Sequence, residues 1–128
     1  MTDLRFLRRV LAIDGITTAA FGIALLAGAA LLAPLLGYPE TFIRSVGIAL
    51  LPIAALVTWM ASRPAPPAPL VWALIVGNGL WVAESLVLLT QFALTPLGVA
   101  FTLGQAAFVA TMGVLEYAGL RRAAVLAA

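Results

Sequence analysis

Charged residues are sparse along this chain, and the apolar sequence between them falls into four long uncharged stretches: residues 15–39, 45–62, 64–83 and 85–115. A helix needs about 20 predominantly apolar residues to cross a hydrocarbon core about 30 Å thick. Each of the first three stretches is long enough for one crossing. The fourth holds the end of one crossing, a turn at Thr95 and Pro96, and most of another. The pattern therefore predicts four transmembrane helices, at 10–33, 41–60, 70–91 and 97–119.

Short turn sequences separate the predicted helices. Glycine and two prolines interrupt residues 34–40, and residues 62–69 read SRPAPPAP. Thr95 is placed to cap the fourth helix, with Pro96 in its first turn. Connections this short make consecutive helices antiparallel neighbours. We therefore expect residues 1–128 to form one domain of the all-α class, an antiparallel up-down-up-down four-helix transmembrane bundle.

The first apolar run raises the question of a secretory signal peptide, because arginines precede it. Signal-peptide cores usually span 7–15 residues. The run from Ile16 to Leu36 is longer and ends in a turn sequence at Gly37. We expect it to be retained as the first helix.

Composition narrows the classes of function. Hydrophobic residues make up 64% of the 128 residues and charged residues only 9%, against roughly a quarter in soluble chains. The chain contains no Cys and no His, so thiolate metal sites, imidazole ligands and a histidine general base are excluded. The sequence contains no catalytic triad, metal cluster or phosphate-binding loop. We expect no enzymatic motif, no metal and no cofactor.

The basic residues predict the orientation in the membrane. All seven are arginines; six fall on one side of the predicted topology and only Arg44 on the other. Cytoplasmic loops carry the excess of Lys and Arg. The Ala-rich, Lys-free composition is typical of a GC-rich bacterial genome. We therefore expect a multi-pass protein of the bacterial inner membrane with both termini cytoplasmic, embedded in lipid and without a nucleic-acid partner, since charge this sparse builds no nucleic-acid surface.

Polar side chains at membrane depth gather on one face of the third predicted helix. At 100° per residue, an arc of about 140° holds all of its strongly polar residues: Asn78, Trp81, Glu84, Ser85 and Gln91. The opposite arc is aliphatic and suits lipid. This division is typical of a helix packed in a bundle. In the fourth helix Gln105 and Glu116 lie on a common face.

Glu84 is the deepest acidic residue in this topology. It lies about 21 Å along the third helix, within about one turn of the level of Gln105. A charged carboxylate at the membrane centre costs about 2.5–3.5 kcal/mol on insertion scales. We expect Glu84 to face the interior and to be hydrogen-bonded to Gln105, paired with Arg44, or protonated. Its role is either structural pairing or part of a transport path.

The remaining polar residues have simpler interpretations. Asn78 and Gln105 are expected to join helices through hydrogen bonds, and Ser85 and Gln91 would extend the same polar path. Asp14 and Glu116 lie shallow on the cytoplasmic side. We expect them to form ion pairs with nearby arginines: Arg8, Arg9, Arg121 and Arg122.

Several segments resemble small uncharacterised four-helix integral membrane proteins of bacteria. These segments are Asp14-Gly15, Leu36-Gly37-Tyr38-Pro39 with Arg44, Leu50-Leu51-Pro52, Asn78-Gly79-Leu80-Trp81-Val82, and the run from Leu115 to Arg122. The resemblance covers nearly the whole chain and implies the same four-helix topology. In size and helix count the chain is also similar to DoxX-type subunits.

Two functions follow as hypotheses. The first is a non-enzymatic subunit that assembles with itself or with other membrane proteins, because almost no mass lies outside the membrane. The alternative is a small oligomeric transporter or channel whose polar path runs around Glu84. A membrane enzyme ranks third, with acid–base work by Glu84 as its only candidate chemistry.

Overall fold

Four long helices make up the computed structural model, which describes residues 2–127 and the side chains of residues 4–123. They are α1 (Thr2–Leu36), α2 (Glu40–Ser62), α3 (Ala68–Gln91) and α4 (Pro96–Ala127). No strand occurs among the described residues. Each helix is long and apolar enough to cross a membrane. The predicted all-α, four-helix class is confirmed, and the chain is a multi-pass membrane protein by length and composition.

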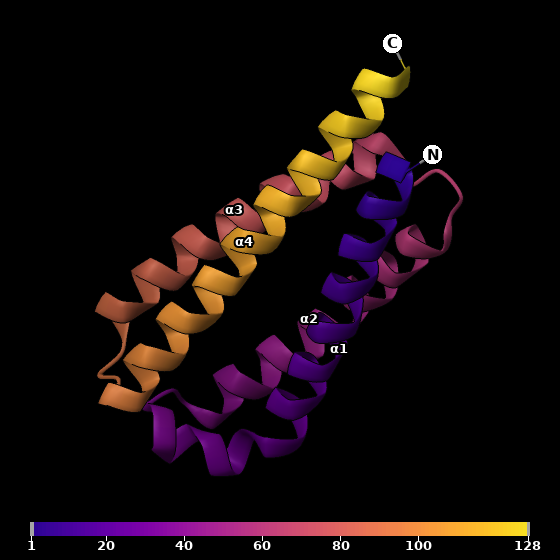
Figure 1. The fold of residues 1–128 in the computed structure, drawn as a ribbon. Coiled ribbons are helices and arrows are strands. Elements are labelled where there is room, and N and C mark those ends of the chain that lie inside the picture. The colour runs from indigo at the N-terminus through magenta and orange to yellow at the C-terminus, as the bar shows by residue number, and fades with distance from the viewer. Residues whose placement is uncertain (1, 128) are drawn as a thin grey trace.

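The first and last helices of the chain are longer than predicted at the ends that carry arginines. α1 begins at Thr2 and α4 ends at Ala127, because residues 2–9 and 120–127 contain no Gly or Pro and favour helix. The expected turn at Pro34 is wrong. Pro34 lies inside α1, and the helix ends at Gly37, whose φ of 91° suits glycine. α1 bends in its second half (Figure 1).

The helices pack in the order α2, α1, α4, α3 and do not close a ring. α1 packs against both α2 and α4, and α3 packs against α4, but no Cα atom of α2 comes within 8 Å of one in α3. The expectation that α2 and α3 are packed neighbours is therefore wrong. Their short connection, residues 63–67, joins helix ends without forcing the two axes together. Figure 1 shows the two hairpins side by side, with this connection and both termini at one end.

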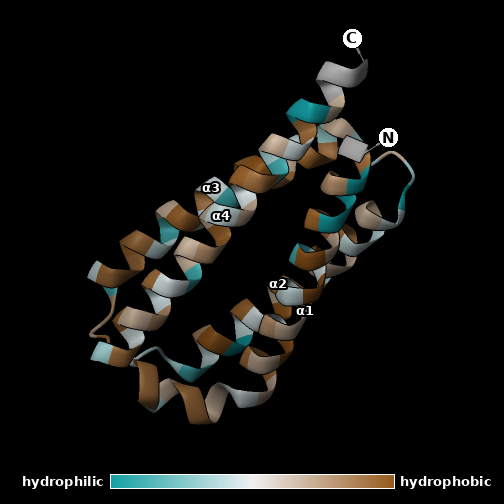
Figure 2. Ribbon diagram, in the orientation of Figure 1, coloured by the Kyte–Doolittle hydropathy of each residue, from teal (hydrophilic) through white to brown (hydrophobic). Residues whose placement is uncertain are grey.

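Apolar packing is concentrated at the two ends of the molecule. At the end that carries both termini, hereafter the terminal end, all four helices contribute to one buried cluster: Leu7, Leu11, Val57, Met60, Val71 and Leu120. At the far end, α1 and α2 bury a second cluster that includes Leu25, Ala29 and Ile43. Hydrophilic segments gather near the terminal end, while hydrophobic residues run along all four helices (Figure 2).

The far end is tied together by the two connections there. The rings of Tyr38, Phe42 and Phe92 pack with centroids 5.3–5.4 Å apart. Thr95 donates its side-chain hydroxyl to the Leu35 carbonyl at 2.6 Å. The Thr95 hydroxyl also accepts the Gly98 amide at 3.0 Å, which confirms the predicted cap of α4.

Candidate intramembrane binding site

A cavity of about 570 Å³ lies at mid-length and is lined by residues of all four helices. It exists because α2 and α3 stand apart there and because α3 presents small residues, Ala73 and Gly77, to the gap. The walls are mainly apolar. Five polar residues interrupt them: Asp14, Thr17, Thr18, Asn78 and Gln105. This size and composition fall in the range of small-molecule sites, about 300–1,000 Å³ with few polar groups.

Two acidic side chains are buried beside this cavity. Asp14, on α1, lines it and is 7% exposed; Glu116, on α4, lies behind it and is 0% exposed. Asn78 Nδ2 donates to Glu116 Oε1 at 2.7 Å, and Thr18 Oγ1 donates to Asp14 Oδ1 at 3.1 Å. The two carboxyls are also within hydrogen-bonding reach of each other. Their second oxygens, Asp14 Oδ2 and Glu116 Oε2, are buried without any other partner.

The expected ion pairs of Asp14 and Glu116 with arginines are wrong. Among the described residues the only ion pair is Arg44 with Glu40, at 3.0 Å. Three of the arginines expected to pair with these acids contact other groups: the Ala61 carbonyl for Arg8, the Tyr117 hydroxyl for Arg121 and the Phe6 ring for Arg122. Long arginine side chains reach the membrane surface, whereas the two carboxyls lie between helices.

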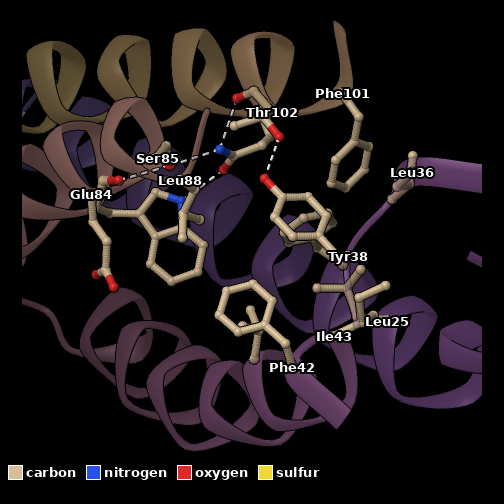
Figure 3. Close-up of a pocket in the computed structure, with 14 residues that line it drawn as sticks. Leu25, Leu36, Tyr38, Phe42, Ile43, Glu84, Ser85, Leu88, Phe101 and Thr102 are labelled. Atoms are coloured by element: carbon tan, nitrogen blue, oxygen red, sulfur yellow. Dashed lines mark hydrogen bonds between the residues drawn. The ribbon is translucent and has the colours of Figure 1, made fainter. Parts of the chain in front are cut away.

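Gln105 is the centre of a hydrogen-bond network between α3 and α4. Its Oε1 accepts from Trp81 Nε1 at 2.7 Å. Its Nε2 donates to Ser85 Oγ at 2.8 Å and to the Thr102 carbonyl at 2.9 Å. Thr102 in turn shares a 2.6 Å hydrogen bond with Tyr38 (Figure 3). The structure thus brings together the predicted residues Gln105 and Ser85 and adds Trp81 and Thr102 to them.

Glu84 does not bond to either expected partner. Gln105 is satisfied by the network just described, and Arg44 pairs with Glu40. Glu84 is exposed and lines a smaller cavity of about 110 Å³ with α2 residues such as Phe42. Its carboxylate points away from Ser85 and Thr102 (Figure 3). Gln91 is exposed as well, because α4 covers only one side of the polar arc on α3.

The Asp14–Glu116 contact was missed by sequence reasoning. The two residues are 102 positions apart, and both were expected near the same membrane face. Their equal depth in the membrane is the only sequence signal for this contact. Two residues at equal depth meet only when their helices are neighbours, and the structure shows that α1 and α4 are neighbours.

Comparison of this chain with known protein families, curated proteins and solved structures finds no match.

Proposed function

We propose that this protein binds a lipophilic small molecule within the membrane, in the large cavity, and acts as a small carrier. The observation that carries the proposal is the 570 Å³ cavity bounded by all four helices. A well-packed interior has few voids larger than a water molecule. A cavity of this size can accommodate a small molecule. Its apolar walls suit a hydrocarbon body, and its few polar groups suit one polar end.

The way in for such a ligand lies between α2 and α3. These helices do not pack against each other, and both contribute lining residues, Ile53 and Leu56 from α2 and Ala73 and Gly77 from α3. A molecule dissolved in the bilayer would enter sideways without crossing water. This route differs from the sequence-based hypothesis of a polar path around Glu84.

Trp81 offers a direct test, because it lines the cavity while Trp59 and Trp72 do not. With Trp59→Phe and Trp72→Phe, Trp81 becomes the sole tryptophan, which can be excited selectively over Tyr38 and Tyr117. Adding 1-bromododecane to this variant in lipid nanodiscs should quench the fluorescence of Trp81, and the quenching should saturate as the bromododecane concentration rises. The comparison variant that keeps only Trp72, which is exposed, should show non-saturating quenching by probe dissolved in lipid.

Two glycines of α3 supply the matched control. A Cβ at Gly77 or at Gly79 would meet nothing within 4 Å, but only Gly77 lines the cavity. Gly77→Phe should abolish the saturating component because its ring fills the site, and Gly79→Phe should preserve it. Saturation that survives Gly77→Phe, or quenching of Trp81 without saturation, would contradict the proposal.

A second candidate function is that of an accessory or self-assembling subunit of a membrane complex. It is favoured by α3, whose Cα atoms come within 8 Å of those of α4 but not of α1 or α2. Leu80 and Val87 are exposed on it, Gly79 has open space above it, and Glu84 has no hydrogen-bond partner among the described residues. Small residues let a second helix approach closely, and a polar group in lipid favours a partner.

We further propose that the protein lies in the bacterial inner membrane with both termini cytoplasmic. The support is the distribution of arginine: six of seven fall at the terminal end or in residues 63–67. The chain has no Cys, so Ala65→Cys gives a unique label site. This thiol should react with a membrane-impermeant maleimide only after the cells are opened; labelling of intact cells would reverse the orientation.

A further inference from the structure

We propose that the large cavity selects a lipophilic cation, whose positive charge is held by the Asp14–Glu116 pair. This inference rests on the proposed binding function and names the class of ligand. It goes beyond a general hydrophobic site because the polar groups beside the cavity are acids. An apolar body would lie between α2 and α3, and its charged end would lie against Asp14, which lines the cavity.

The buried acidic pair favours a positively charged ligand. Two carboxyls lie almost completely buried in contact with each other, and no arginine forms an ion pair with either among the described residues. A buried carboxylate is costly unless it is paired. No positive charge among the side chains that the structure describes compensates the two carboxyls. A cationic ligand in the adjoining cavity would provide that charge.

The groups around the pair leave that negative charge uncompensated. From α1 comes the Thr18 hydroxyl and from α3 the Asn78 amide, both neutral donors. The charged residues of α2, Glu40 and Arg44, pair with each other near its first turn, at the far end. Beyond Glu116, the charges of α4 are Arg121 and Arg122, which contact Tyr117 and Phe6. Glu84 of α3 lines the other cavity.

A shared proton would account for the two carboxyl oxygens that have no hydrogen-bond donor. Asp14 Oδ2 and Glu116 Oε2 are both buried and have no donor. A single proton placed between them makes one a donor and the other an acceptor, as in other pairs of adjacent carboxyls. The pair then retains one negative charge for a ligand.

The test uses two ions of matched size and shape and opposite charge. Tetraphenylphosphonium and tetraphenylborate would each be used to displace 1-bromododecane from the Trp81-only variant in nanodiscs. Opposite charges attract, and like charges repel, more strongly in a site of low dielectric constant than in water. The cation should therefore displace the probe at a concentration at least about tenfold lower than the anion. Equal potency of the two ions would overturn the inference.

Variants assign the selectivity to the pair. Asp14→Asn with Glu116→Gln keeps the size of both side chains and the oxygens that accept from Thr18 and Asn78. This double variant should bind the bromoalkane as before and lose the preference for the cation. Glu84→Gln removes a carboxylate outside the large cavity and should keep the preference. A preference that survives the double variant would overturn the inference.

Single variants cover the case in which the double variant does not fold. Asp14→Asn and Glu116→Gln each remove one carboxylate, and each should reduce the preference for the cation. Glu84→Gln should not reduce it. A cation preference that neither single variant reduces would overturn the inference and leave the binding function standing. Absence of saturable bromoalkane binding would instead overturn the binding function itself, and this inference with it.

Discussion

At the scale of single residues, neighbours decide the environment of each acid more than depth does. Glu84 is the deepest carboxylate by position in the sequence, yet it is exposed. Glu116, expected near the membrane surface, is fully buried and bonded to Asn78. The difference arises because α1 and α3 both flank α4, so a side chain on the covered face of α4 is enclosed from two sides.

Gln105 illustrates how one residue satisfies several polar groups at membrane depth. It accepts from Trp81 and donates to Ser85 and the Thr102 carbonyl. Its amide therefore leaves little capacity for Glu84. Hydrogen bonds of this kind between membrane helices are worth about 0.6 kcal/mol each on average. The network joins α3 to α4 and at the same time forms the boundary between the two cavities, because Gln105 and Trp81 line both.

At the scale of helices, glycine allows the backbones of α1 and α2 to approach each other closely. A Cβ at Gly47 would lie 2.8 Å from the Gly22 carbonyl oxygen and 2.8 Å from the Leu26 amide nitrogen. Both are backbone atoms of α1, so neither yields without moving the helix. The α1–α2 hairpin depends on this contact, whereas α3 has open space at Gly77 and Gly79.

We therefore expect Gly47→Leu to destabilise the protein, by about 1–3 kcal/mol as for other overpacked interiors. Gly104→Leu is the control, since a Cβ there meets nothing within 4 Å. It should be neutral or slightly stabilising, because leucine favours helix over glycine by up to about 1 kcal/mol. Unfolding in detergent followed by circular dichroism measures both. Equal loss in the two variants would show that the close contact is not what Gly47 supplies.

At the scale of the whole molecule, the open order of the helices leaves α3 with an unpartnered side. If the protein assembles with itself through α3, oxidation of a Gly79→Cys variant in native membranes should give a disulfide-linked dimer. Gly104→Cys, on the open side of α4, should not. Native mass measurement in mild detergent should show the same dimer. A monomer under several gentle conditions, together with no cross-link, would count against self-assembly.

The sequence by itself determined the number of helices, the approximate places of the three connections and the cap at Thr95. These are local properties: a span needs a run of apolar residues, and a turn needs Gly, Pro or a capping hydroxyl nearby. The predicted ends of α1 and α4 are too short, because an apolar run delimits only the part of a helix that suits lipid and nothing at residues 2–9 or 120–127 breaks a helix.

Only the tertiary structure decided which helices are neighbours, and the candidate site follows from that. The angular position of a residue on its helix specifies a direction, but not what lies in that direction. The packing of α1 on α4 brings Asp14 to Glu116, and the separation of α2 from α3 creates the cavity beside them. The α1–α4 packing depends on close contacts between residues far apart in the chain, such as Gly119 with Leu7, which no local pattern encodes.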